Sequence, residues 1–242
     1  MKKIFGFFLF ILISTQAFAN SSNWFSSFSH HNENYATLGD TKDQLKGQIG
    51  FKYKVIEDID FYVGYTQVII WSVYNTKQST SPRDINYNPE LFYRKDFFWL
   101  MHTQLNLIPF EHKSNGRADQ NEREYNLVGA SIINTINFKN FDLFFGMKFY
   151  KLFGVGDDNY DIGNYIGLGQ HTIGVKTKFL LREELGIGFL IGTSGYVTKT
   201  YNLSISLTKQ YGLYFQIYDG YCETLIAYAV KDTHYRAGIT FR

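Results

Sequence analysis

Apolar and polar side chains alternate along many segments of this chain. The clearest apolar rows are Phe141, Leu143, Phe145, Met147 and Phe149; Leu203, Ile205 and Leu207; and Leu213, Phe215 and Ile217. Side chains two positions apart leave the same face of a β-strand, so each row predicts a strand with one apolar face. Alternation over segments of about ten residues, separated by turn residues, is typical of a membrane β-barrel.

The segments between these rows carry turn signals and show no change in composition. Turns are predicted at 139–140, 157–161 and 231–232, where Asn, Asp and Lys gather. At about ten residues per strand, the chain supplies ten to twelve strands plus loops. We therefore expect an all-β protein, a transmembrane antiparallel β-barrel of ten to twelve strands, formed by residues 20–242 as a single domain; the resemblance described below implies about 12 strands.

The first nineteen residues are predicted to be a signal peptide. Lys2 and Lys3 precede an apolar run, and the small-x-small pattern of residues 17–19 is a cleavage signal. The apolar run is too short to cross a bilayer as a helix, and an uncleaved anchor is the alternative reading. Cleavage after Ala19 lowers Lys+Arg from 24 to 22, which equals the 22 Asp+Glu. A neutral mature chain does not suggest nucleic acid as a partner.

Composition then separates a membrane barrel from a soluble β-sandwich, which would show similar alternation. Aromatic residues make up 19% of the chain, with 23 Phe and 19 Tyr, whereas only 3 residues are Pro. Aromatic residues favour strands and form the girdles at both edges of a membrane barrel. Together with the signal peptide, they favour the barrel. The single cysteine, Cys222, excludes an internal disulfide framework.

Candidate chemistry is concentrated in residues 110–126. His112 and Ser114 are two positions apart and share a strand face, and Asn126 follows a polar segment suited to a turn. A base, a hydroxyl and an amide that can orient the base are the parts of a Ser-His nucleophilic site. His-x-Ser also occurs by chance, so the alternative is a pair of ordinary polar residues near the barrel rim.

The stretch from His112 to Asp119, His-x-Ser-Asn-Gly-Arg-x-Asp, resembles the signature of bacterial outer membrane phospholipase A. Asn126 falls at that family's spacing from Ser114. Segments 64–67, 86–92, 157–162 and 218–223 also look like family segments, in the same order. The resemblance implies a twelve-stranded barrel in the bacterial outer membrane and a homodimer as the active form. It also implies calcium-dependent hydrolysis of phospholipid acyl esters, with phospholipase A1, A2 and lysophospholipase activities.

The resemblance assigns roles to further residues. Ser114 is the expected nucleophile, His112 its base and Asn126 the residue that orients the base, with the Gly116 amide donating to the oxyanion. Ca²⁺ takes oxygen ligands, and the implied ligands are the Arg117 carbonyl, Glu122, Asp158 and, from the partner subunit, Ser79. Thr80 and Ser81 lie close enough to compete with Ser79. Glu122 stands where the family has a hydroxyl residue, and we expect a carboxylate there to tighten calcium binding.

Two features bear on where the site lies. His112 and Ser114 share parity with Ile108 and Phe110, so an apolar, lipid-facing row is expected to carry them, although Pro109 leaves the register open. Gln67 interrupts another apolar row and is expected either to pair across a dimer interface or to face the lumen. Two rival functions, a passive pore and a surface adhesin, use the same barrel but need no site of this kind.

Overall fold

The chain folds as a closed antiparallel β-barrel with almost no helix. The computed structural model describes residues 28–39, 45–56, 58–74, 81–179 and 182–241, so the expected signal peptide lies outside the described residues. Its elements, in chain order, are β1 (Phe28–His30), β2 (Asn34–Gly39), β3 (Leu45–Ile56), β4 (Ile59–Trp71), β5 (Asp84–Phe98), β6 (His102–Ser114), β7 (Glu124–Asn137), β8 (Phe141–Phe153), the 3-10 turn η2 (Asp157–Asn159), α2 (Gly163–Ile166), β9 (Gly169–Thr177), β10 (Glu183–Ile191), β11 (Val197–Ser206), β12 (Tyr211–Gly220) and β13 (Asp232–Phe241).

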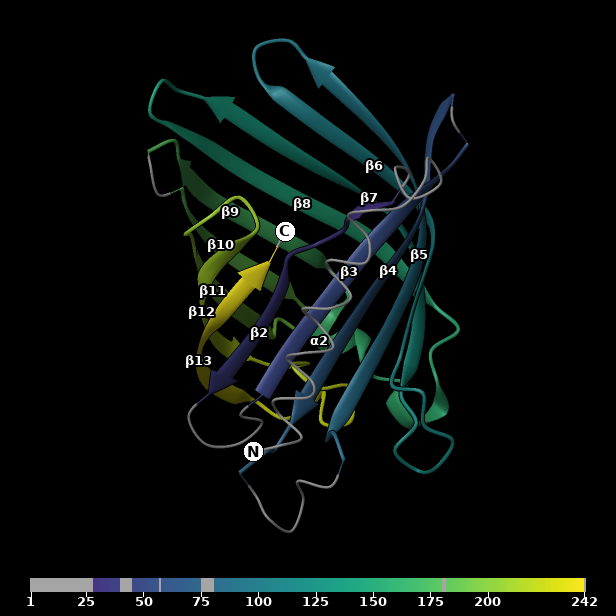
Figure 1. Ribbon diagram of the computed structural model, residues 1–242. Coiled ribbons are helices and arrows are strands. Elements are labelled where there is room, and N and C mark those ends of the chain that lie inside the picture. Colours follow the sequence, from purple (N-terminus) through teal and green to yellow (C-terminus); the bar gives the residue numbers. More distant parts are fainter. Residues whose placement is uncertain (1–27, 40–44, 57, 75–80, 180–181, 242) are drawn as a thin grey trace.

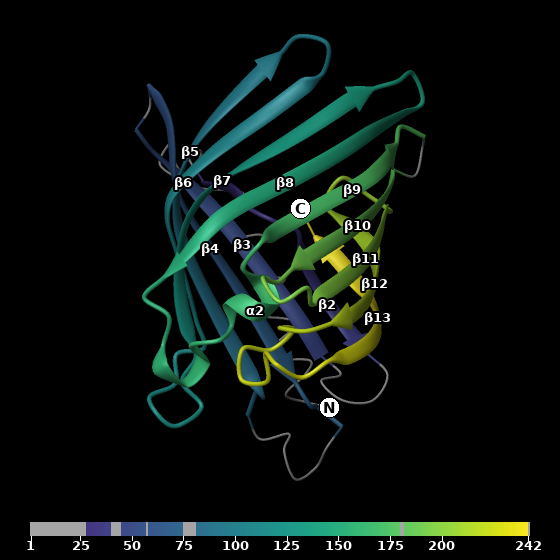
Figure 2. The same ribbon diagram turned by 180° about the vertical axis from the view of Figure 1, so that it is seen from behind.

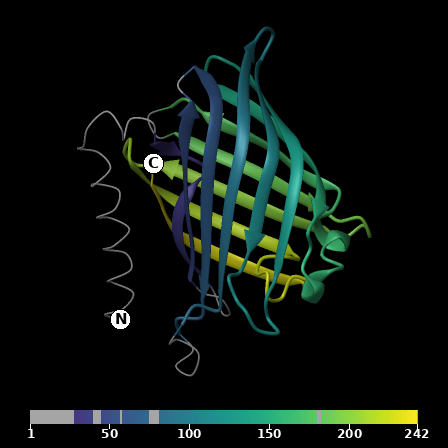
Figure 3. The same ribbon diagram turned by 90° about the vertical axis from the view of Figure 1, so that its right-hand side faces the viewer.

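Each strand from β3 to β13 pairs with its neighbours in sequence, and β13 closes the barrel on β2. The short strands β1 and β2 both pair with β3, at residues 51–53 and 45–48 respectively. They act as one strand interrupted at residues 31–33, so the barrel has 12 strands, as predicted. Figures 1 and 3 show these strands side by side, tilted around a common axis. None of the helices in the described part of the chain is long and apolar enough to cross a bilayer.

The alternation of side chains separates the inner face of the barrel from the outer one, as predicted. On β12, Leu213, Phe215 and Ile217 point outward and are exposed, whereas Tyr214 and Gln216 are buried inside. The interior cavity has a volume of about 710 Å³ and is lined mainly by charged and amide side chains. An apolar outer face and a polar interior are typical of membrane barrels.

The loops close one end of the barrel. Figure 2 shows α2 and the loop between β12 and β13 at this end, opposite the tips of the long β5–β6 and β7–β8 hairpins. Ile162 and Leu225 of the loops and Ile166 of α2 pack with Phe92 and Leu127 of the strands in a buried apolar cluster. This cluster fills the end of the barrel near which β6 ends and β7 begins.

Candidate active site

A β-bulge decides which way the end of β6 faces. Ile108, Glu111 and Lys113 all line the interior cavity, although Ile108 and Glu111 differ in parity. The pairing of β6 with β7 shifts register between Ile108 and Glu111, because Pro109 and the residue after it are accommodated in a bulge. His112 and Ser114 therefore alternate with inward residues and lie on the outer face. The sequence predicted that Ile108 lies on the same outer row as His112 and Ser114. This prediction was wrong for Ile108, which is buried inside the barrel.

His112 and Asn126 face each other across the β6–β7 pair. Asn126 Oδ1 lies 2.9 Å from His112 Nδ1, and Asn126 Nδ2 donates to the Gly154 carbonyl at 3.2 Å. A carbonyl only accepts hydrogen bonds, so this contact fixes the amide with Oδ1 toward the imidazole. His112 must then carry its proton on Nδ1, which leaves Nε2 as a bare base.

Gly154 can make this contact because of its backbone conformation. Its φ is +53°, a left-handed value that glycine adopts readily. A Cβ at this position would lie 2.6 Å from Asn126 Nδ2. The glycine that follows β8 therefore leaves room for the amide that orients His112.

Ser114 is the last residue of β6 and is half-buried between β5 and β7. Its neighbours across the sheet are Tyr87 and Glu124. Beyond it, Gly116 has a φ of +63°, and a Cβ there would lie 2.7 Å from the Tyr87 ring. Tyr87 therefore supports the chain immediately after Ser114, and a larger residue at 116 would displace it.

Asn115 shapes the loop that follows Ser114. Its backbone N–H donates to the Arg123 carbonyl at 3.0 Å, and its Oδ1 accepts from the Arg123 N–H at 3.1 Å. Its Nδ2 donates to the Asn121 carbonyl at 2.7 Å. This buried side chain thus supplies the hydrogen bonds that a turn would otherwise lack. Sequence reasoning missed it, although an Asn directly before Gly116 is a recognisable turn signal.

Four carboxylates surround an open pocket beside this loop. Glu122 and Asp158, two of the expected calcium ligands, line it together with Glu124 and Asp157. Within the described ranges, no three His, Cys, Asp or Glu side chains form a group that could hold a metal ion. The Arg123 guanidinium lies 3.7 Å from the Asp158 carboxylate and balances part of its charge.

The remaining expected ligands differ in how far the structure describes them. Ser79 and Thr80 lie outside the described residues, whereas Ser81 is described and exposed. The Arg117 side chain donates to the Arg83 carbonyl at 3.1 Å, which attaches the loop after Ser114 to the start of β5.

Gln67 lies on the outer face of β4. Its neighbours Thr66 and Val68 line the interior cavity, so the alternative of a lumen-facing Gln67 is excluded. The Tyr65 hydroxyl donates to Gln67 Oε1 at 3.4 Å. Gln67 pairs across the sheet with Tyr87, which in turn pairs with Ser114. The lone amide of the apolar row and the candidate nucleophile are thus two strands apart at the same level of the barrel.

Comparison with known proteins agrees with this geometry. The model of the family described as phospholipase A1 matches residues 7–241. A phospholipase A1 of Salmonella typhimurium is 30% identical over 206 residues, which cover 82% of this chain and 69% of that protein. A phospholipase A1 of Escherichia coli (strain K12) is 29% identical, also over 206 residues and with the same coverage of both chains.

Solved structures give the same result. The outer membrane phospholipase A from Escherichia coli matches with a TM-score of 0.77 and 25% identity, over 93% of this chain and 95% of that chain. The outer membrane phospholipase of Salmonella typhi, a dimer with bound calcium, matches with a TM-score of 0.73 and 25% identity, over 89% of this chain and 92% of that chain. This chain therefore belongs to the phospholipase A1 family and is an outer membrane phospholipase.

Proposed function

We propose that Ser114, His112 and Asn126 form the catalytic site that hydrolyses phospholipid acyl esters. The observation that carries this proposal is the hydrogen-bonded chain from the Gly154 carbonyl through Asn126 to His112 Nδ1. It leaves His112 Nε2 free to accept a proton on the face of β6 that also carries Ser114. An amide in this role orients the imidazole but adds no charge to stabilise imidazolium.

The reaction proceeds in two steps. Ser114 Oγ attacks the ester carbonyl carbon while His112 Nε2 takes the hydroxyl proton. The ester C–O bond then breaks, and His112 returns the proton to the leaving glycerol oxygen. Water, deprotonated by His112, attacks the acyl-serine, and the fatty acid leaves as Ser114 regains its proton. The Gly116 amide is the proposed hydrogen-bond donor to the oxyanion in both steps.

The outward direction of Ser114 supports a substrate that comes from the membrane. The residue that precedes the site on the outer face, Phe110, is apolar and exposed. A phospholipid in the membrane can therefore reach Ser114 by lateral diffusion, with its acyl chain against apolar side chains. We propose phospholipase A1, A2 and lysophospholipase activities, because all three hydrolyse the same kind of bond, a carboxylic ester between a fatty acid and glycerol.

We propose calcium as the cofactor, with Glu122, Asp158 and the Arg117 carbonyl among its ligands and Ser79 contributed by the partner subunit. The donor set fits a hard cation, since Glu122 and Asp158 line one pocket and both present oxygen. When bound, the ion would supply positive charge that stabilises the developing oxyanion. A donor from a second subunit would agree with the relative from Salmonella typhi, which is a dimer with bound calcium.

We also propose that Gln67 pairs with its counterpart in a homodimer and that residues 1–19 are removed before the barrel, residues 20–242, is assembled. An amide within an apolar outer row is costly in lipid unless a partner satisfies it. Gln67 also lies at the level of Ser114, so a dimer formed there places the second subunit next to the site.

The rival function of a passive pore is disfavoured by the interior. Ile162, Ile166 and Leu225 pack into one end of the barrel and leave a lumen that is filled there by side chains. An adhesin would need no catalytic site, and membership of the phospholipase A1 family disfavours it.

Fatty-acid release from phospholipid mixed micelles tests the proposal, with wild type and Ser114→Ala each assayed with calcium and with a chelator. The proposal predicts release that requires both Ser114 and calcium. Release that is equal in Ser114→Ala would remove Ser114 from the mechanism, and release that persists with the chelator would remove calcium.

A further inference from the structure

The pairing of β5 with β6 is interrupted directly behind the candidate site. Paired positions run from Tyr87↔Ser114 to Glu90↔Glu111 and skip residues 88–89 of β5 and 112–113 of β6. Pro89 lies in this gap and has no N–H to contribute to the sheet. The segment that carries His112 therefore lacks part of its regular backbone support on the β5 side.

The side chain of Asn88 occupies this gap from inside the barrel. Oriented with its nitrogen toward two acceptors, its amide donates to the His112 carbonyl at 2.9 Å and to Glu111 Oε1 at 3.1 Å. A side-chain amide with two N–H groups can serve both oxygens at once. Asn88 thus attaches the backbone of His112 to a carboxylate on the inner face of the barrel.

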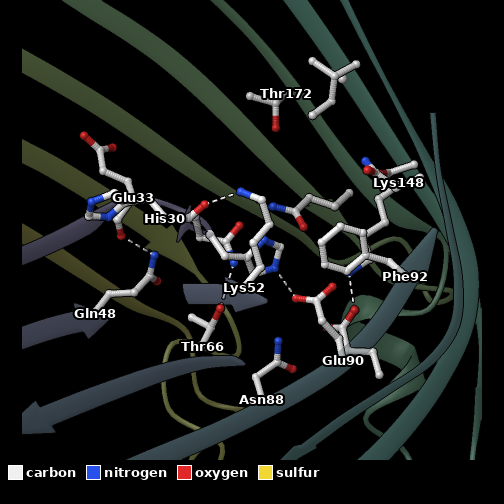
Figure 4. A pocket seen from close by; sticks show the side chains of 18 of the residues that line it. His30, Glu33, Gln48, Lys52, Thr66, Asn88, Glu90, Phe92, Lys148 and Thr172 are labelled. Carbon is white, nitrogen blue, oxygen red and sulfur yellow. Dashed lines mark hydrogen bonds and ion pairs between the residues drawn. The ribbon is translucent and has the colours of Figure 1, made fainter. Parts of the chain in front are cut away.

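Charges in the interior cavity hold that carboxylate in place. Glu111 lies directly opposite Glu90 on β5, and two like charges at such a position repel each other. Lys148 of β8 forms an ion pair with Glu111, and His31 contacts Glu90 while its ring stacks on Phe92. Figure 4 shows Asn88, Glu90 and Lys148 reaching into the same cavity.

We propose that Asn88 and the Glu111–Lys148 pair are positioning residues for the catalytic site: from inside the barrel they fix the backbone of His112, whose side chain acts on the outside. The inference rests on the proposed catalytic role of His112. A shift of the His112 backbone moves Nε2 relative to Ser114 Oγ, and small misplacements of reacting groups are costly in rate. The polar interior therefore serves the chemistry as well as the stability of the barrel.

The test compares Asn88→Leu with Asn86→Leu as a matched control. Asn86 lies two residues earlier on the same face of β5 and is buried, whereas Asn88 is half-buried. The Oδ1 of Asn86 has no hydrogen-bond partner within the part of the chain that the structure describes. Both variants exchange an interior amide for a side chain of similar size. The gel mobility of folded, unheated barrel and the denaturant midpoint report whether each variant folds.

We expect Asn88→Leu to lower kcat by about 10- to 100-fold at an unchanged KM. The rate at which an alkyl sulfonyl fluoride inactivates Ser114 should fall by a similar factor. Asn86→Leu should retain both rates. Glu111→Gln keeps an acceptor for the Asn88 amide but loses the charge that pairs with Lys148, so its kcat should fall less than that of Glu111→Leu, which should resemble Asn88→Leu. If the loss of kcat in each variant were proportional to its loss of denaturant midpoint, whichever residue is replaced, the role of Asn88 would be purely structural.

Two outcomes would overturn different parts of the account. If Asn88→Leu and Asn86→Leu show equal kcat and equal inactivation rates while Ser114→Ala is inactive, the positioning role is wrong and the catalytic site stands. If Ser114→Ala is as active as wild type, the proposed site fails, and the inference about Asn88 fails with it.

Discussion

Replacing Gly154 with Ala should impair catalysis by displacing the Asn126 amide, which is the link between the loop after β8 and His112. The new Cβ would lie 2.6 Å from Asn126 Nδ2, a distance that no real pair of atoms of this kind keeps. Because Nδ2 is at the end of a side chain, Asn126 can rotate away more easily than the backbone can move. Rotation breaks the hydrogen bond to His112 Nδ1 and releases the imidazole from its orientation.

The magnitude follows from the two effects of the substitution. The left-handed φ of Gly154 costs an alanine about 1–2 kcal/mol of folding stability. Loss of the hydrogen bond between Asn126 and His112 removes about 0.5–1.5 kcal/mol of net stabilisation of the correct geometry. Since about 1.4 kcal/mol corresponds to a tenfold change in rate, kcat should fall by about two- to tenfold.

A matched variant separates strain from displacement. Gly195 also has a left-handed φ, of +82°, but no atom lies within 4 Å of the position of its Cβ. Gly195→Ala should therefore lose similar stability and keep its kcat. Denaturant unfolding in lipid vesicles measures stability, and fatty-acid release at saturating substrate measures kcat. Equal kcat in the two variants would refute the reasoning that the Gly154 contact orients Asn126.

Three further predictions concern the loops and the outer face. Burial alone would raise the pKa of Glu223, but the charges of Lys46 and Arg236 outweigh it and lower the pKa to about 2 from an ordinary 4.5. The ionised Glu223 should therefore add about 3 kcal/mol to the free energy of unfolding above about pH 4.5, and this contribution should be lost as the pH falls toward 2. In Glu223→Gln, the free energy of unfolding should depend less on pH over this range. Gln67→Leu should lower the crosslinked dimer fraction at constant protein-to-detergent ratio, and an unchanged fraction would remove Gln67 from the interface. Glu122→Ala should raise the calcium concentration for half-maximal activity by about tenfold, as loss of one carboxylate ligand implies, and an unchanged requirement would count against Glu122 as a ligand.

Much of the fold could be predicted from the sequence because barrel strands repeat every second side chain. The rows through Leu213 and Leu203 gave strands whose apolar face proved to be the outer one. The spacing of His112 and Asn126 also sufficed to bring the two residues together, since a β-hairpin makes them direct neighbours. These predictions depend on local periodicity and on a single turn.

What could not be predicted depends on departures from that periodicity. The outward direction of His112 was expected, but from an unbroken alternation with Ile108. The bulge at Pro109 breaks that alternation, so Ile108 points inward and His112 outward. The positions of Gly154, Asn115 and Asn88 around the site depend on left-handed backbone and on contacts between strands distant in sequence. No periodic pattern encodes such contacts. The side on which Gln67 lies was also open until the inward direction of Thr66 and Val68 was known.

The central claim is that Ser114 is a nucleophile activated by an oriented His112. The most direct test is to label the folded protein with an alkyl sulfonyl fluoride and to locate the adduct by peptide mass spectrometry. The account predicts one sulfonyl group on the peptide that contains Ser114. It should form in wild type, form about two- to tenfold more slowly in Asn126→Ala, and form far more slowly in His112→Ala. Labelling at another residue, or at Ser114 with the same rate in all three proteins, would contradict it.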